Sequence, residues 1–219
     1  MAVGYVLPVL GVLLIVGFWA VRRRGRAGED KGARGEREVK KALEAGLGRD
    51  YLCLHDLIVP ARHGTTTQID HVCLSVYGIF VVETKNFSGR ICGGGGDALW
   101  TQELFGKRFV FQNPLRQNYA HIKALSELLG LPVDNFHSVV VFLDGCELQG
   151  RPPAGVCRIG QAAGRIKSFK KTLLDQGRVE EAAAVLAQKK FRATGRKRRA
   201  HVKQLQKRLQ KRPKTTKPL

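Results

Sequence analysis

Hydrophobic residues recur along this chain with two different spacings, and the spacing changes near residue 50. Before that point, apolar residues fall at i, i+3, i+4 and i+8, the spacing of one helix face, and the helix begins near Gly35. These residues are Val39, Ala42, Leu43 and Leu47. After it, runs rich in β-formers predict strands at 51–59, 68–76, 79–85 and 90–92.

The second half of the chain mixes short strands with longer helices. Asn113 and Pro114 predict a helix start, with Asn113 as the N-cap and Pro114 at the first helical position. That helix runs to about residue 129, and the other elements expected are strands at 99–100, 108–111, 138–143 and 155–159 and helices at 161–174, 177–191 and 196–209. This order predicts an α/β fold in which helices flank a mixed sheet.

The N-terminal segment has the composition of a membrane-spanning helix. Residues Ala2 to Val21 include no charged side chain, and twenty residues at about 1.5 Å each span the roughly 30 Å of a bilayer core. Arginines follow at positions 22, 23, 24 and 26, where a signal peptide would have its cleavage site. We therefore favour an uncleaved anchor in the cell (inner) membrane, with a cleaved signal peptide or a soluble hydrophobic helix as alternatives. The positive-inside rule then puts the N-terminus outside, and the short polar linker 22–31 and the rest of the chain in the cytoplasm.

Charge is concentrated at the other end of the chain. The 219 residues hold 38 Lys and Arg against 18 Asp and Glu, and 14 of the basic residues and none of the acids follow Glu181. We expect residues 177–219 to form a basic helical extension that contacts the phosphates of a nucleic acid. Its predicted contact residues are Arg196, Lys197, Arg198, Arg199, Lys203, Lys207, Arg208, Lys211 and Arg212. Contact with an anionic membrane surface and a solvated, partly disordered extension are the alternatives.

The cysteine pattern suggests no disulfide framework. The chain has five cysteines, an odd number, and no C-x-x-C pair. Cys53 and Cys73 lie inside apolar runs, so we expect both to be buried reduced thiols, in agreement with a reducing compartment.

Three charged residues interrupt the apolar strands. Alternation along a strand places Glu83 and Lys85 on one face. If residues 77–78 form a two-residue hairpin loop, Asp70 lies opposite Lys85, about 5 Å away at Cβ, and diagonal to Glu83 at about 7 Å. Charged side chains beside a core are rarely buried without a role.

This group suits metal-assisted phosphodiester hydrolysis. Asp70 and Glu83 are oxygen ligands of the kind that Mg²⁺ prefers, with Mn²⁺ as a substitute. Lys85 would orient or deprotonate the attacking water, or stabilise the negative charge of the transition state. The spacing alone is equally typical of a partly buried Asp70–Lys85 salt bridge with Glu83 in solvent.

Several short segments, in this order, resemble the successive motifs of the nuclease-related domain (NERD) family. They are GARGE at 32–36, QIDH at 68–71, GIFVVETKNFSG at 78–89, Trp100 and QNPLRQN at 112–118. The resemblance covers residues 32–145 and predicts a nuclease-like domain over 32–175. It implies the restriction-endonuclease-like fold of the PD-(D/E)xK group and a divalent-metal nuclease.

The same resemblance implies roles for individual residues. Asp70, Glu83 and Lys85 match the catalytic core, Glu36 is the accessory acid and metal ligand, and Gln117 matches a recurrent glutamine that touches metal, water or phosphate. One departure is Ala33, which stands where the family usually has a first glutamate. We expect His71 to be a packed or hydrogen-bonded histidine and Trp100 a core residue.

Together these observations predict a membrane-anchored, Mg²⁺-dependent nuclease acting on DNA. No organic cofactor is expected. The competing hypothesis is a non-catalytic, membrane-tethered module that binds a nucleic acid or a protein.

Overall fold

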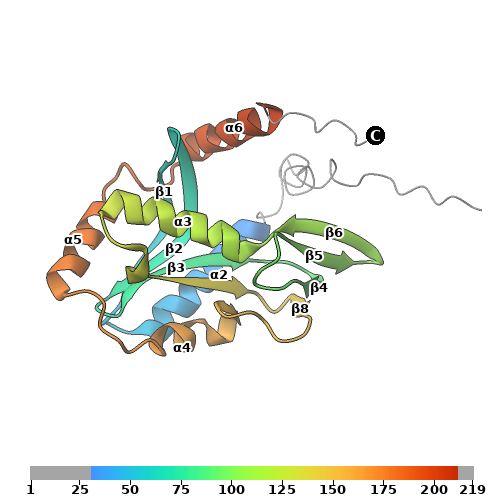
Figure 1. Cartoon of the computed structure of the whole chain (residues 1–219), viewed down its shortest axis with the longest axis horizontal. Coiled ribbons are helices and arrows are strands. Elements are labelled where there is room, and N and C mark those ends of the chain that lie inside the picture. The colour runs from blue at the N-terminus through green and yellow to red at the C-terminus, as the bar shows by residue number, and fades with distance from the viewer. Residues whose placement is uncertain (1–30, 212–219) are drawn as a thin grey trace, which may run out of the picture.

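A computed structural model describes residues 31–211 of the chain, with side chains up to residue 204 (Figure 1). The predicted membrane segment 2–21, nearly all of the linker and Arg212 lie outside this range. Within it, no helix combines the length and apolar character needed to cross a bilayer.

A five-stranded mixed sheet forms the centre of the fold, in the order β1-β2-β3-β7-β9. β1, β2 and β3 are antiparallel neighbours, whereas β3, β7 and β9 run parallel. The bounds are Leu52–Ala61 for β1, Thr65–Ser75 for β2, Gly78–Lys85 for β3, Phe136–Phe142 for β7 and Val156–Arg158 for β9.

A second, smaller sheet of order β6-β5-β4-β8 extends from one end of the first. Its strands are β4 (Gly89–Cys92), β5 (Leu99–Leu104), β6 (Lys107–Gln112) and β8 (Cys146–Leu148). Trp100 lies at the junction, 2% exposed, with its ring stacked on that of Phe142 at 6.0 Å. The expected core position of Trp100 is therefore confirmed.

Helices cover both faces of the central sheet. On one face, α2 (Lys31–Leu47) and α4 (Ala162–Lys167) pack on the side chains of Phe80, Val82 and Val139. On the other, α3 (Pro114–Leu129) and α5 (Gln176–Leu186) pack on those of Ile79 and Val81. The last helix, α6 (Gly195–Lys211), lies beside the long β1–β2 hairpin (Figure 1). Two short 3₁₀ helices, Val133–Asn135 and Ile159–Gln161, lie before β7 and after β9. The predicted mixed α/β architecture is confirmed.

The register of the β2–β3 hairpin differs from the prediction by two residues. Ser75 pairs with Gly78, so the loop is formed by residues 76–77 and not by 77–78. Gly78 has a φ of 123°, and a Cβ atom there would lie 2.9 Å from the carbonyl oxygen of Asn135. Glycine therefore starts β3 where it passes close to a distant segment. Since the shift is an even number of residues, every side chain stays on its predicted face.

The predicted helix at 161–174 is too long. α4 ends at Lys167, where the Ser168 side chain donates a hydrogen bond to the carbonyl of Arg165. The chain then becomes irregular, and the N–H groups of Leu173 and Leu174 both donate to the carbonyl of Val76. These bonds to the hairpin loop replace the last turns of the expected helix.

The prediction for Cys53 and Cys73 is wrong, because the two residues form a disulfide. They are direct partners in the antiparallel β1–β2 ladder, with Cα atoms 4.1 Å apart. Two cysteines that face each other on adjacent strands are close enough to be bridged. These two cysteines therefore give no support to a reducing compartment.

The predicted N-cap at Asn113 is confirmed, and the side chain does more than cap α3. Its Oδ1 accepts a hydrogen bond from the N–H of Leu115 at 2.9 Å, and its Nδ2 donates to the carbonyls of Gly94, Gly95 and Asp97. The side chain is fully buried. It therefore ties the start of α3 to the glycine-rich loop before β5.

Replacing Asn113 with Ala is expected to lower the free energy of unfolding by about 2–4 kcal/mol, because it removes a cap and leaves carbonyls unpaired. Urea unfolding measures the change. Asn113→Ser keeps an N-cap oxygen but not the Nδ2 donor, so it should lose about half as much. Equal losses for Ser and Ala would contradict a contribution from the cap.

Candidate active site

The site forms where β2 and β3 stop pairing. His71 opposite Val82 is the last ladder pair toward the β3 C-terminus. Just beyond it the N–H of Thr84 donates to the Oδ2 of Asp70 at 2.8 Å, so the carboxylate takes the place of a backbone acceptor. Asp70 is half-buried at this opening. The end of the ladder thus fixes one carboxylate among apolar strands.

Glu83 is the buried acid of the site, 4% exposed, and its carboxylate has several donors around it. Its Oε1 accepts hydrogen bonds from the Nζ of Lys85 at 2.7 Å and the Nε2 of Gln117 at 2.7 Å. Lys85 also donates to the Oε1 of Gln117 at 2.8 Å. Glu83, Lys85 and Gln117 therefore form a closed triangle in which each group orients the other two.

The predicted pairing of Asp70 with Lys85 is wrong, because the ion pair of Lys85 is with Glu83. The two-residue shift of the hairpin brings Asp70 level with Glu83 instead. The alternative was an Asp70–Lys85 salt bridge with Glu83 in solvent. It is excluded because Lys85 pairs with Glu83 and because Glu83 is buried.

His121 is a site residue that the sequence analysis missed. Its Nε2 lies 3.2 Å from the Oε2 of Glu83, and its Nδ1 lies 2.9 Å from the hydroxyl oxygen of Thr67. The first contact is a close approach and not a well-directed hydrogen bond, because this buried Nε2 has no partner in hydrogen-bonding geometry among the described residues. The signal was available, since Gln117 and His121 are four residues apart and share one face of a helix.

α3 is fixed to the sheet at the point where it carries Gln117 and His121. Asn118, fully buried, donates from Nδ2 to the carbonyl of Val81 and to the hydroxyl of Ser138, both at 2.8 Å. These bonds fasten α3 to β3 and β7 between Gln117 and His121.

Glu36 reaches the site from the opposite face of the sheet. It lies in the first turns of α2, next to Gly35, where a Cβ atom would lie only 2.8 Å from the Cβ of Asn86. This absence of a side chain lets α2 approach the end of β3. Glu36 is half-buried and close enough to raise the pKa of Asp70.

The surroundings shift the pKa values of Asp70 and Glu83 in opposite directions. Burial, followed by the charges of Glu83 and Glu36, raises the pKa of Asp70 well above its usual value. Burial acts in the same direction on Glu83, but the charge of Lys85 and the contact with His121 outweigh it and lower the pKa of Glu83 to about 2. Glu83 is thus ionised at neutral pH, and a further cation beside Asp70 would relieve the repulsion.

The residues fit a magnesium ion that keeps much of its water. Within residues 31–211, no group of three or more His, Cys, Asp and Glu side chains is arranged to hold a metal ion. Mg²⁺, however, is commonly held by one or two carboxylates plus water and substrate phosphates. Asp70 and Glu83 have carboxylate oxygens of this kind and would hold such an ion, and Glu36 is close enough to act on the charge of Asp70.

His71 lies next to the site but faces the protein interior. It is 1% exposed, and its ring nitrogens contact His55 Nδ1 at 2.9 Å and the Thr84 hydroxyl oxygen at 3.2 Å. The expectation of a packed, hydrogen-bonded histidine is confirmed. Burial and the neighbouring His55 lower the pKa of His71 to about 3.

The lowered pKa of His71 predicts a loss of stability in acid. Below pH 6.5 the unfolded chain takes up a proton that the folded chain refuses down to about pH 3, so stability is complete above 6.5 and falls by up to about 1.4 kcal/mol per pH unit below it. Urea unfolding measures the free energy of unfolding at pH 7.5 and at pH 5.0. Between these two pH values, His71→Gln should lose about 2 kcal/mol less of it than the wild type does. His63→Gln, at an exposed position, is the control, and equal losses in all three proteins would refute the assignment.

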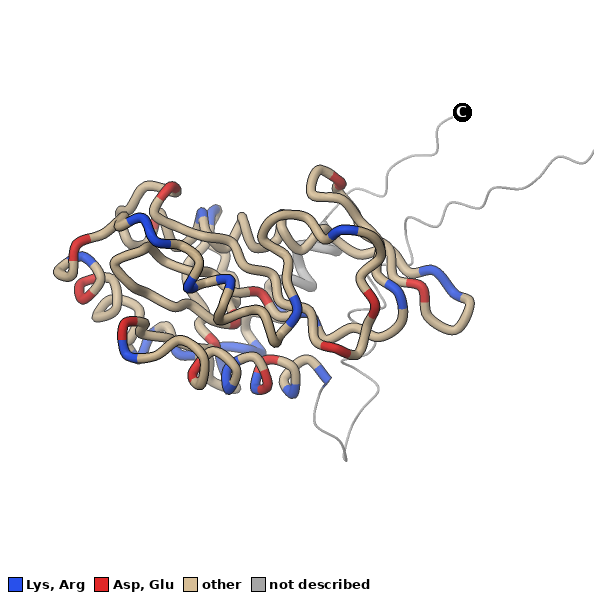
Figure 2. Tube along the Cα trace, turned by 90° about the horizontal axis from the view of Figure 1, so that it is seen from below, with Lys and Arg blue, Asp and Glu red and all other residues tan. Residues whose placement is uncertain are grey.

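The predicted extension 177–219 divides into two parts: α5 packs in the core of the domain, and only the basic helix α6 is docked on its outside. The Arg198 guanidinium pairs with Asp56, and Gln204 and His201 contact Thr66. Lys and Arg are spread over much of the domain (Figure 2), but the chain after Glu181 holds no acid at all. The predicted contact residues up to Lys211 therefore belong to one helix beside β2.

Comparison with known proteins gives one family and one relative. A family model described as nuclease-related domain (NERD) matches residues 31–143 and covers every acid, lysine and glutamine of the site. An uncharacterized protein of Bacillus anthracis is 48% identical over 99 residues, which make up 45% of this chain and 47% of that protein. The chain thus spans about half the length of this curated relative. No solved structure matches.

Proposed function

Because this chain belongs to the nuclease-related domain family, we propose that it is a divalent-metal-dependent nuclease that hydrolyses phosphodiester bonds of DNA. The observation that carries the proposal is the meeting of Asp70, Glu83 and Lys85 at the end of the β2–β3 ladder. Two carboxylates and a neighbouring lysine are the components that metal-assisted hydrolysis requires.

Each residue of the site has a distinct part in the proposed reaction. Asp70 and Glu83 would hold Mg²⁺ or Mn²⁺, which when bound acidifies a water and neutralises charge on the phosphate. The Nζ of Lys85 donates to the Oε1 of Glu83, and from there its ammonium can stabilise a phosphate oxygen as negative charge develops. Gln117 holds both groups in place, and Lys85, followed by His121, lowers the pKa of Glu83.

The location of the protein is a second part of the proposal. The uncharged segment 2–21 followed by an arginine cluster supports a single anchor in the cell membrane, with the nuclease domain on the cytoplasmic side. With Cys53 and Cys73 paired, the orientation rests on the arginines alone.

A plasmid assay tests the function. The full chain in detergent micelles is incubated with supercoiled plasmid, with Mg²⁺, with Mn²⁺ or with EDTA. Metal-dependent nicking or degradation is the expected result. Salt-sensitive binding without cleavage under any of these conditions would favour the non-catalytic, tethered binding module instead.

A further inference from the structure

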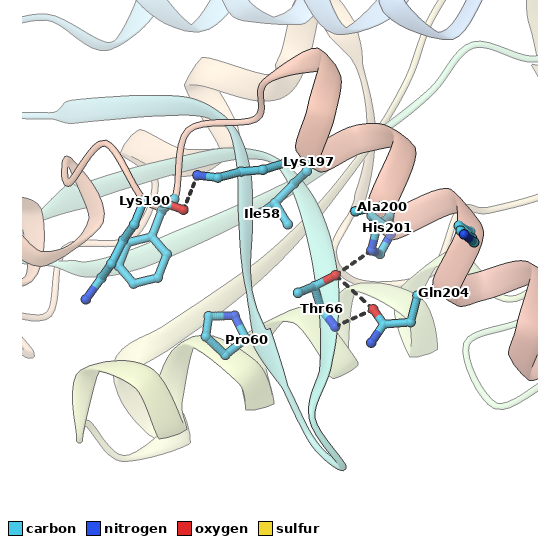
Figure 3. A pocket seen from close by; sticks show the side chains of 10 residues that line it. Ile58, Pro60, Thr66, Lys190, Lys197, Ala200, His201 and Gln204 are labelled. Carbon is cyan, nitrogen blue, oxygen red and sulfur yellow. Dashed lines mark hydrogen bonds between the residues drawn. The ribbon is translucent and has the colours of Figure 1, made fainter.

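A pocket of about 780 Å³ opens between α6 and the β1–β2 hairpin (Figure 3). The volume is in the range of ordinary small-molecule sites. Its walls are mainly apolar and come from both strands of the hairpin, from the chain before α6 and from α6 itself, with Ile58, Pro60, Phe191 and Ala200 as the principal side chains. A pocket of this size with mainly apolar walls has room for an aromatic ring system.

The rim of the pocket is cationic. Lys190 and Lys203 line it, and no acidic residue does. Lys197 also lines it, but its ammonium is occupied, because it donates to backbone carbonyls that include those of Lys189 and Arg192. The ammonium of Lys190 lies over the ring of Phe191, 4.9 Å from its centroid, and no backbone bond occupies Lys190 or Lys203 among the described residues, so both can bind anionic groups.

The wall made by α6 is fixed in place. The N–H and the hydroxyl of Thr66 both contact the Oε1 of Gln204 at 3.1 Å, and the Nε2 of Gln204 donates to the carbonyl of Gly64 at 3.1 Å. The Nδ1 of His201 lies 2.8 Å from the Thr66 hydroxyl (Figure 3). The pocket is therefore built before any ligand arrives.

The pocket lies close to the candidate active site. Thr66 and Asp70 are four residues apart on β2, about 13 Å at about 3.3 Å per residue. The next residue, Thr67, contacts His121, which contacts Glu83. At about 3.4 Å per nucleotide of a stacked strand, this distance along β2 corresponds to about four nucleotides.

We propose that the pocket accepts one unpaired base of the substrate strand, with the neighbouring phosphates on Lys190 and Lys203. A base in an intact duplex is stacked on both faces and cannot enter, so the pocket selects nucleic acid with a single-stranded segment near the cleaved bond. The inference rests on the proposed function, since it takes the ligand to be the nucleic acid on which that site acts.

Filling the pocket without changing its charge gives the test. Ala200→Trp places a ring in the pocket from an exposed position on α6. Ala184→Trp makes the same change on the exposed face of α5 and is the control. Binding of full-length protein to fluorescein-labelled dT12 and to a blunt 12-base-pair duplex is followed by anisotropy in EDTA. We expect Ala200→Trp to weaken dT12 binding about tenfold and duplex binding less than twofold. Lys203→Gln should weaken both and reduce the salt dependence.

Two results would overturn the proposal. One is an Ala200→Trp effect that is absent, or equal for dT12 and duplex. The other is displacement of dT12 from the wild type by a soluble short-chain phosphatidylserine that no longer binds Ala200→Trp, which would assign the pocket to a lipid. Because EDTA prevents metal-dependent cleavage, binding is scored separately from catalysis. A protein that fails the plasmid assay but shows the dT12 preference would lose the nuclease and keep the pocket.

Discussion

Replacing Asp70 with Asn is expected to reduce metal-dependent plasmid cleavage by about a thousandfold, and Glu83→Gln should do the same. A bound metal is worth several kcal/mol to the transition state, and about 4 kcal/mol corresponds to that factor. The amide that Asp70→Asn introduces can still accept the hydrogen bond from the Thr84 N–H, so the sheet is retained while the negative ligand is lost.

Thermal unfolding separates this loss from misfolding. Ionised Asp70 is unfavourable without a cation, because its pKa is raised by burial and by two neighbouring carboxylates. Asp70→Asn should therefore be as stable as the wild type or more so in EDTA, and Mg²⁺ should raise the melting temperature of the wild type but not that of Asp70→Asn. Asp144→Asn, at an exposed position, is the matched control. Cleavage by Asp70→Asn within tenfold of the wild type would reject the metal-ligand role.

Replacing Lys85 with Met is expected to reduce cleavage by about 100- to 10,000-fold, the usual range for loss of a positioned proton donor or electrostatic stabiliser. The side chain keeps its length and loses the ammonium that contacts both Glu83 and Gln117. Because Lys85 is the main group that lowers the pKa of Glu83 against the effect of burial, that pKa should rise in the variant.

The pH profile shows which effect dominates. Metal binding requires ionised Glu83, so the residual activity of Lys85→Met should fall at a higher pH in acid than that of the wild type. Lys85→Arg keeps the charge and should leave this acid limb unmoved. A Lys85→Met protein with wild-type activity at pH 7.5 would show that Lys85 is only a structural partner of Glu83.

Much of the site could be predicted because it depends on local periodicity. Strand alternation placed Glu83 and Lys85 on one face, and the Asn-Pro helix start placed Gln117 one turn into α3. These inferences survived a two-residue error in register, since an even shift leaves the faces unchanged.

The missed features all depend on contacts between distant segments. Gly78, where the hairpin loop ends, lies close to the carbonyl of Asn135, which comes from far along the chain. The Cys53–Cys73 bond depends on the register of two strands, and the contact of His121 with Glu83 on how α3 packs against β3. The periodicity of single residues along the chain does not predict which distant residues pair. The one indication was that Gln117 and His121 share a face of α3, which suggested that both face the same site.

The hydrogen bond from the Thr84 N–H to Asp70 has a consequence for reading related sequences. Asp70 is at once a proposed metal ligand and the acceptor that satisfies a backbone donor at the end of the ladder. A related protein that had lost catalysis would still need a hydrogen-bond acceptor for the Thr84 N–H. Asp or Asn would therefore be retained at position 70 because it completes the end of the β2–β3 ladder. Among the described residues Lys85 donates to side chains and to no backbone group, so its presence in a relative is the better marker of the proposed catalysis.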